Sequence, residues 1–321
     1  MLDATAAGVY VIAVTPFHGD GRIDTASADR MVDFYRGCGV DGMTILGMMG
    51  EALKLETDEA IGFSRQVIKR CGTMPVIVGV SAPGFAAMRA LARSVMDAGA
   101  AGVMIAPPGT VRTDDQVAGY FDQCVQTIGA DVPFVIQDFP QASGVQIAPS
   151  VIRRIVAAHA SCVMLKHEDW PGLEKVTAVR RLMEEGAMRR ISTLCGNGGI
   201  FLDFETERGA DGAMTGYAFP DMLVDIVKMQ KAGERDRAHD LFDAHLPLMR
   251  YELQPGIGLA VRKHVLKLRC AIASDAQRAP GTSLSAIARS EVKYLLQRLA
   301  RRDRRAAGLA DDPPLKRSGH A

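Results

Sequence analysis

The chain has 321 residues, 48% of them hydrophobic, and 38 Lys and Arg residues nearly balance 37 Asp and Glu residues to leave a net charge of +1. That length can bury a barrel-sized core or two smaller ones, and the near-neutral charge gives no electrostatic case for nucleic acid or an anionic membrane as a partner. No apolar run approaches a membrane span, and the first residues do not resemble a signal peptide.

The six cysteines are scattered along the chain without Cys-x-x-Cys pairs. This spacing predicts reduced thiols in a cytoplasmic protein and favours neither a metal site nor disulfides.

Short β-branched runs alternate with longer amphipathic stretches. Strands are predicted at 9–14, 43–46, 76–80, 103–106, 134–137, 163–166, 191–194 and 213–215. Helices are predicted at 26–38, 58–70, 86–98, 114–128, 149–158, 173–185, 201–207 and 221–231. Eight strands, each followed by a helix, predict the α/β class and a (β/α)₈ TIM barrel. A doubly wound sheet is the alternative, but no Gly-x-Gly-x-x-Gly follows the first strand, and Pro16 ends it.

Further apolar helical patterns follow the last barrel helix, and the end of the chain is polar and punctuated by Pro and Gly. We expect the barrel over 1–232, a C-terminal helical extension over 233–303 and a disordered tail over 304–321.

In such a barrel the chemistry lies where the strands end. The second predicted strand is followed by Gly47-Met48-Met49-Gly50, whose backbone N–H groups could hold a carboxylate or a phosphate. A plain tight turn explains the same residues equally well.

Lys166 ends the sixth predicted strand, after an apolar run, and it is the most informative residue of the sequence. Lysine is rarely buried without a function, and a desolvated amine that loses its proton can attack a carbonyl to form a Schiff base. Side chains alternate along a strand, so if Lys166 points inward then Glu168 does too, while His167 points outward. A carboxylate beside a buried amine suits proton transfer. Two alternatives remain open: the Lys166 side chain merely reaches solvent, or Glu168 is only its salt-bridge partner.

Several of these motifs, taken in order, resemble the dihydrodipicolinate synthase/N-acetylneuraminate lyase family. They are Val14-Thr15-Pro16-Phe17, Gly47-x-x-Gly50-Glu51, Pro140-x-x-x-Gly144, Lys166 and Gly212-Ala213-Met214-Thr215-Gly216. The resemblance covers about residues 8–299 and implies a homotetrameric or dimeric barrel lyase that acts on a pyruvate-like 2-oxo acid. It also implies that Lys166 carries the Schiff base and that neither a metal nor another cofactor is needed.

The departures from the family pattern point to a subgroup. The two threonines of the synthase turn are replaced by Met48 and Met49, the strand-five tyrosine by Gln137 and the aldehyde-binding arginine by Ala142. Gln137-Asp138 and Lys166-x-Glu168 are similar to the 2-keto-3-deoxy sugar-acid dehydratases.

The sequence therefore predicts dehydration of a 2-keto-3-deoxy sugar acid. The catalytic candidates are Lys166, Glu168 and Gln137, and the substrate-binding candidates are Gly47, Met48, Met49, Gly50, Asn197 and Met214. An aldolase that releases pyruvate, a 4-hydroxy-tetrahydrodipicolinate synthase, a non-catalytic keto-acid-binding paralogue and a phosphate-binding barrel of unrelated chemistry are the alternatives.

Overall fold

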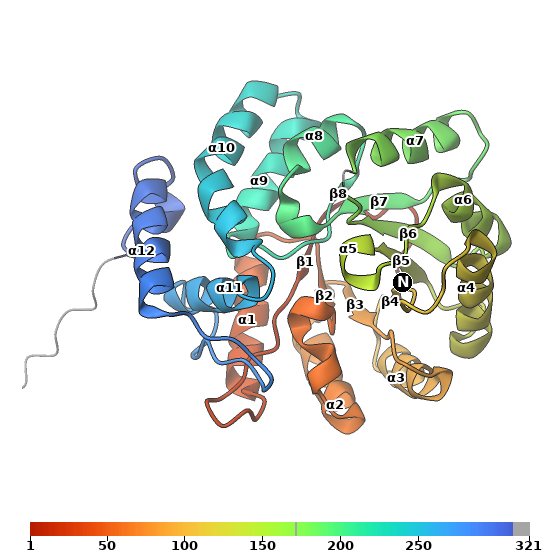
Figure 1. Ribbon diagram of the computed structural model, residues 1–321, viewed down its shortest axis with the longest axis horizontal. Coiled ribbons are helices and arrows are strands. Elements are labelled where there is room, and N and C mark those ends of the chain that lie inside the picture. The colour runs from red at the N-terminus through yellow and green to blue at the C-terminus, as the bar shows by residue number, and fades with distance from the viewer. Residues whose placement is uncertain (171, 311–321) are drawn as a thin grey trace, which may run out of the picture.

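The computed structural model describes residues 1–170 and 172–310. A closed barrel of eight parallel strands lies at its centre, and the strands follow one another around the barrel in sequence order (Figure 1). The strands are β1 Gly8–Ile12, β2 Gly42–Ile45, β3 Val76–Gly79, β4 Gly102–Ile105, β5 Phe134–Asp138, β6 Cys162–His167, β7 Ser192–Cys195 and β8 Gly212–Ala213. The surrounding helices are α1 Thr25–Gly37, α2 Thr57–Cys71, α3 Phe85–Asp97, α4 Asp114–Ile128, α6 Pro149–Ala158, α7 Leu173–Glu184, α8 Leu202–Glu207 and α9 Pro220–Lys231.

The predicted (β/α)₈ barrel is confirmed, and every predicted strand and barrel helix has a counterpart whose ends differ by no more than two residues. Helix boundaries follow the expected signals. Thr113 and Gln116 form a capping box at the start of α4, for example, and Gly129 ends that helix with a φ of 109°. The sequence pattern missed the four-residue helix α5 Pro140–Ser143, which is too short to show a period.

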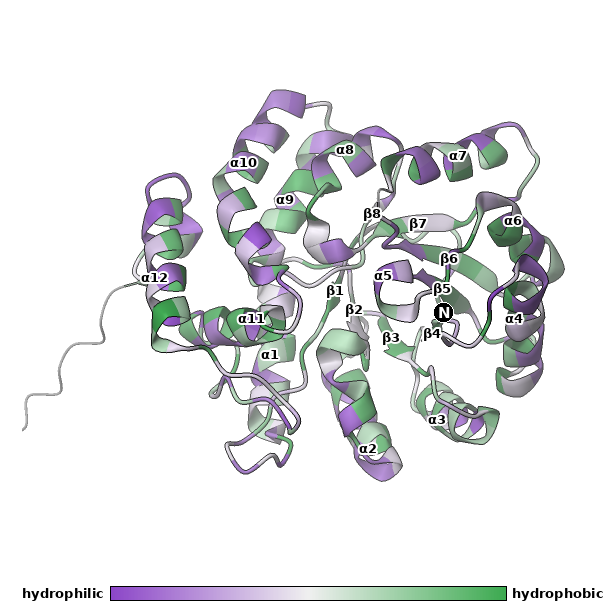
Figure 2. Cartoon of the chain, viewed as in Figure 1, coloured by the Kyte–Doolittle hydropathy of each residue, from purple (hydrophilic) through white to green (hydrophobic). Residues whose placement is uncertain are grey.

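Side chains along the strands alternate between the barrel interior and the layer of helices. One buried cluster fills the interior, and a larger one lies between strands and helices. Figure 2 shows that the helices around the barrel carry both hydrophobic and hydrophilic residues. The interior cluster contains Tyr10, Ile12, Ile77, Met104, Val135, Met164, Leu194 and Met214.

The barrel closes between β8 and β1, where Gly212 pairs with Gly8. A Cβ atom on Gly212 would lie 2.0 Å from the backbone oxygen of Gly8, and its φ of 150° also favours glycine. Glycine is therefore required for the two strands to meet, and this closure brings the residues after β8 to the mouth of the barrel.

Within the residues that the structure describes, four further elements follow α9: α10 Arg235–Glu252, α11 Gly258–Leu268, α12 Ala286–Ala300 and the short 3₁₀ helix η4 Arg304–Ala306. In Figure 1 these helices lie on one side of the barrel, and α10 packs on α9, α11 and α12. The division into a barrel at 1–232 and an extension at 233–303 stays a prediction.

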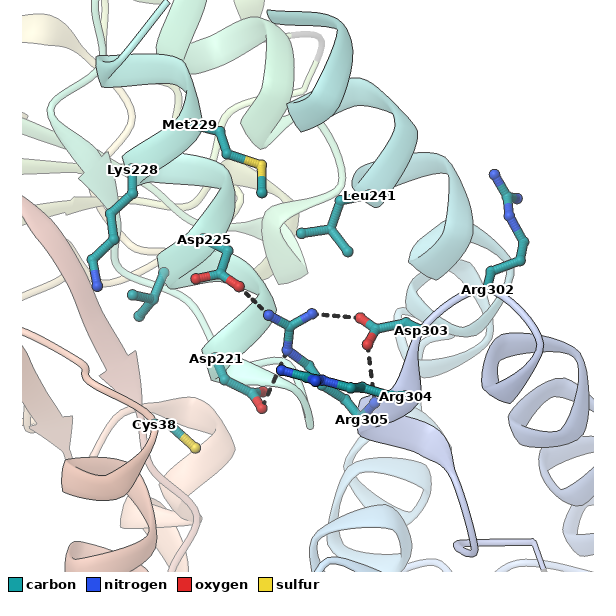
Figure 3. Close-up of a pocket in the computed structure, with 11 residues that line it drawn as sticks. Cys38, Asp221, Asp225, Lys228, Met229, Leu241, Arg302, Asp303, Arg304 and Arg305 are labelled. Carbon is teal, nitrogen blue, oxygen red and sulfur yellow. Dashed lines mark hydrogen bonds and ion pairs between the residues drawn. The ribbon is translucent and has the colours of Figure 1, made fainter. Parts of the chain in front are cut away.

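At the start of the predicted tail, Arg305 of η4 takes part in ion pairs. Its guanidinium contacts Asp221 and Asp225 of α9, and its Nη1 lies 2.6 Å from Asp303 (Figure 3). These side chains line a hollow of about 710 Å³. The rest of the predicted tail, 311–321, lies outside the described residues.

Candidate active site

A pocket of about 340 Å³ lies at the carboxyl ends of the strands and contains Lys166. Its walls come from β1, β5 and β6, from the segments after β2, β7 and β8, and from residues 252–262 of the C-terminal helices. None of its lining residues borders the larger hollow beside Arg305. This is the position where barrels of this kind carry their chemistry.

Lys166 and Glu168 form a buried ion pair inside this pocket. The Lys166 Nζ lies 2.7 Å from the Glu168 Oε2, and the side chains are 5% and 8% exposed. The predicted inward direction of both residues is thus confirmed. An amine and a carboxylate at this distance can exchange a proton without a mediating water.

Neighbouring residues hold Glu168 in one position. The Gln137 Nε2 donates a hydrogen bond to the Glu168 Oε2 at 2.9 Å, and the Asn197 Nδ2 donates one to the Glu168 backbone oxygen at 2.8 Å. A Cβ atom on Gly196 would lie 2.2 Å from the Glu168 Cγ, so only glycine leaves room for the carboxylate. The predicted candidates Gln137 and Asn197 both line the pocket.

His167, which is expected to point outward, belongs to a separate buried group with Asp138 and Lys175 on the helix side of the barrel wall. The His167 Nδ1 lies 3.7 Å from the Asp138 Oδ2, and the Nζ of Lys175 on α7 lies 2.6 Å from that same carboxylate oxygen. Nearby on α8, Glu205 is 6% exposed, and burial raises its pKa to about 7, which the neighbouring His167 opposes.

The turn after β2 borders two adjoining spaces. Met48 and Met49 line the pocket of Lys166, whereas Gly47, together with Met48, lines a second, largely apolar hollow of about 250 Å³. Gly50 lines neither of them, and its backbone oxygen accepts a hydrogen bond from the Thr15 hydroxyl at 2.6 Å.

A buried ion pair fixes this turn to the C-terminal helices. The Glu51 carboxylate accepts a hydrogen bond from the Nζ of Lys263 on α11, and both side chains are fully buried. The backbone of Glu51 is in the left-handed region, with a φ of 55°. Burial lowers the pKa of Lys263, and the Glu51 carboxylate opposes that shift. The position of Met48 and Met49 therefore depends on the extension as well as on the barrel.

Met214, which the sequence predicts to bind substrate, does not line this pocket. Met214 is fully buried in the apolar interior of the barrel, and the two residues after it, Thr215 and Gly216, line the pocket instead. The alternation of side chains places Met214 inward, but below the level at which the pocket opens.

Two buried residues of the C-terminal helices, Arg262 and Glu252, also line the pocket, and no sequence motif predicted them. The Arg262 Nε donates to the Glu252 Oε1 at 2.5 Å, and burial raises the pKa of Glu252, which the guanidinium opposes. A charged residue in an amphipathic helix normally faces solvent, so the sequence pattern gave no sign that Glu252 of α10 and Arg262 of α11 are buried.

No group of three or more His, Cys, Asp or Glu side chains that could hold a metal ion is present in residues 1–170 and 172–310. The six cysteines all lie within these residues and are unpaired. Over the same ranges, no helix combines the length and apolar character needed to cross a membrane.

Fold and site together define the chain as a (β/α)₈-barrel enzyme of the lyase class, with a lysine and a glutamate at the end of its sixth strand. It belongs to the dihydrodipicolinate synthetase family, whose model matches residues 5–299. The family assignment confirms the resemblance inferred from the motifs.

Three individual proteins are similar to this chain. It is 29% identical over 297 residues to an L-2-keto-3-deoxyarabonate dehydratase of Azospirillum brasilense, covering 91% of this chain and 94% of that protein. A crystal structure titled dihydrodipicolinate synthase, from Rhodopseudomonas palustris, is 63% identical with a TM-score of 0.92, covering 92% and 99% of the two chains. YagE of Escherichia coli K12, crystallised in complex with pyruvate, shares the fold at 22% identity with a TM-score of 0.83, over 91% and 98% of the chains.

Proposed function

We propose that this protein forms a Schiff base between Lys166 and a 2-oxo acid and then removes water from a 2-keto-3-deoxy sugar acid. The single observation that carries the proposal is the buried 2.7 Å contact between the Lys166 Nζ and the Glu168 Oε2. It joins the two chemical groups that the reaction needs, a nucleophilic amine and a base.

Imine formation requires the neutral amine of Lys166. In the ion pair the ammonium proton can pass to the Glu168 carboxylate, which leaves the amine free to attack the C2 carbonyl. The carbonyl oxygen then leaves as water together with the proton that Glu168 held, which gives an iminium and returns Glu168 to a carboxylate. The iminium weakens the C3–H bond of the substrate.

Elimination follows from the same pair. Glu168 takes the C3 proton, the resulting enamine expels the C4 hydroxyl group, and that group leaves with the proton held by Glu168 as water. Hydrolysis of the conjugated iminium returns Lys166 and releases the dehydrated 2-oxo acid. Gln137 holds the carboxylate in place through its 2.9 Å hydrogen bond.

Two observations support dehydration over carbon–carbon chemistry. No tyrosine is among the described residues that line the pocket, so a phenol is not at hand to relay a proton to or from a C4 oxygen. The Azospirillum brasilense relative, which is 29% identical over 91% of this chain, is named a dehydratase.

A synthase that condenses pyruvate with an aldehyde is the second candidate. The Rhodopseudomonas palustris protein, 63% identical to this chain, carries that name. Both reactions begin with an imine at Lys166, so imine formation alone does not separate them.

Product analysis tests the proposal. The protein is incubated with five- and six-carbon 2-oxo-3-deoxy acids, and the loss of water is followed by mass spectrometry while pyruvate is measured with lactate dehydrogenase. We expect substrate loss without pyruvate. Pyruvate formed in step with substrate loss would show an aldolase instead, and absence of both imine and product across the panel would favour a non-catalytic keto-acid-binding protein.

The remaining expectations belong to the same proposal. Members of this family act on small 2-oxo acids and are commonly oligomeric, and we propose a homotetramer or dimer located in the cytoplasm. We further propose that the covalent lysine imine takes the place of any external cofactor.

A further inference from the structure

Arg262 places a buried, partly unsatisfied cation in the wall of the pocket. The residue is 4% exposed and lies on α11, outside the barrel proper. Its Nε donates to the Glu252 Oε1, but its buried Nη1 has no hydrogen-bond acceptor within the described part of the chain. A buried donor without an acceptor costs free energy, and such groups in folded proteins call for an explanation.

The Glu252 carboxylate does not satisfy all the hydrogen-bond donors of the Arg262 guanidinium. The Glu252 Oε1 contacts the Arg262 Nε, and the Glu252 Oε2 accepts a hydrogen bond from the Ala218 backbone N–H at 3.2 Å. Both oxygens of the Glu252 carboxylate therefore accept hydrogen bonds from other donors, and neither accepts one from the Arg262 Nη1.

The chain makes room for this guanidinium at the end of β8. A Cβ atom on Gly216 would lie 2.2 Å from the Arg262 Nη1 and 2.8 Å from the Ile12 backbone oxygen. Gly216, Ile12 and Arg262 all line the same pocket as Lys166. The absence of a side chain at Gly216 thus lets a cation from the C-terminal helices reach the mouth of the barrel.

The pocket otherwise offers little to an acidic substrate. Among the described residues that line it, Lys166 and Arg262 are the cations, and the turn after β2 presents methionine side chains at Met48 and Met49. Once Lys166 is bonded to the substrate C2, Arg262 is the remaining cation with donors to spare. A guanidinium fork matches the geometry of a carboxylate.

We propose that Arg262 binds a carboxylate of the substrate within the Lys166 pocket, and that Gly216 is kept free of a side chain for this contact. This inference rests on the proposed function, because it concerns the substrate of the same imine. The carboxylate is either the C1 group beside the imine carbon or a second one at the far end of a sugar diacid, and the experiment separates these two sources.

The test measures borohydride trapping of the imine as a function of substrate concentration. Three probes are used: pyruvate, a five-carbon 2-oxo-3-deoxy monoacid and a six-carbon 2-oxo-3-deoxy diacid. We expect Arg262→Gln to raise the half-saturating concentration by about ten- to hundredfold, the range for hydrogen bonds to a charged group, with full trapping still reached at saturation. A rise for all three probes assigns Arg262 to the C1 carboxylate, and a rise for the diacid alone assigns it to the far end.

Further variants separate binding from folding. The double variant Glu252→Gln with Arg262→Gln removes both charges and leaves no unpaired buried carboxylate. Arg262→Lys keeps the positive charge but removes the planar set of N–H donors of the guanidinium. Arg305→Gln is the matched control, because it also breaks a partly buried arginine–carboxylate cluster but lies beside a different hollow (Figure 3). It should leave the half-saturating concentrations unchanged.

Two outcomes contradict the inference in different ways. If the wild-type protein traps the probes and folded Arg262 variants trap all three at wild-type half-saturating concentrations, the guanidinium does not contact substrate, and the proposed function stands alone. If the wild-type protein traps no 2-oxo acid, the proposed function fails and the inference falls with it.

Discussion

Glu205→Gln should make the protein more stable at neutral pH and should flatten the dependence of its stability on pH. Glu205 lies on α8 behind the wall that carries Lys166, and its Oε2 is buried without a hydrogen-bond partner in the described residues. Burial raises its pKa from 4.5 to about 7. Glutamine keeps the shape of the protonated acid and removes the charge.

The raised pKa of Glu205 determines how the stability of the folded protein changes with pH. A carboxyl group whose pKa is raised on folding binds a proton more readily in the folded state, so its favourable contribution is present below pH 4.5 and is lost as the pH rises to about 7. Each tenfold change in proton affinity is worth about 1.4 kcal/mol, so ionisation of Glu205 costs the folded state up to about 3 kcal/mol at pH 8. For a chain of this size that corresponds to roughly 4–5 °C in the melting temperature.

Thermal unfolding of both proteins between pH 5 and 8 measures the effect. We expect the melting temperature of Glu205→Gln to exceed that of the wild type by several degrees at pH 8, and the difference to shrink toward pH 5. Glu59→Gln is the control. The Arg278 side chain, which hydrogen-bonds the Glu59 carboxylate, lowers the pKa of Glu59, so removal of that carboxylate should have nearly the same effect at pH 5 and pH 8. An equal difference between wild type and Glu205→Gln at both pH values would refute the reasoning.

Three further predictions concern the site. Glu168→Gln should keep imine trapping but slow turnover by about a hundredfold or more, measured by steady-state kinetics, and an active variant would remove Glu168 from the mechanism. Condensation of pyruvate with aspartate semialdehyde should be negligible because no tyrosine lines the described pocket, and a robust rate in a coupled assay would restore the synthase assignment. Gly196→Ala should depress turnover because its Cβ would lie 2.2 Å from the Glu168 Cγ, whereas Gly62→Ala, whose Cβ meets no atom within 4 Å, should leave turnover unchanged.

The barrel and the inward direction of Lys166 and Glu168 were predictable from the sequence because both depend on local patterns. Eight apolar runs separated by amphipathic stretches specify the (β/α)₈ arrangement, and the two-residue period of a strand decides which side chains point inward. Lys166, Glu168 and Gln137 therefore fall where the alternation places them. Met214 was predicted from the motif at residues 212–216, which gives no measure of depth in the barrel, and the residue belongs to the interior cluster.

The other half of the pocket was not predictable, because it depends on contacts between distant parts of the chain. Arg262 of α11 reaches the mouth of the barrel beside Gly216, which follows β8 and leaves space for the guanidinium. The Glu51–Lys263 pair joins positions 212 residues apart. A buried charge within an amphipathic helix has the same sequence pattern as an exposed one, and only the folded chain shows its partner.

Mass-spectrometric mapping of a borohydride-reduced adduct is the most direct test of the central claim that Lys166 forms the imine. After incubation with pyruvate or a 2-oxo-3-deoxy acid and reduction, the peptide that contains Lys166 should carry the added mass, and Lys166→Ala should lose the adduct while it keeps the far-ultraviolet circular dichroism of the wild type. An adduct on a different lysine, or no adduct with any 2-oxo acid that the protein consumes, would contradict the account.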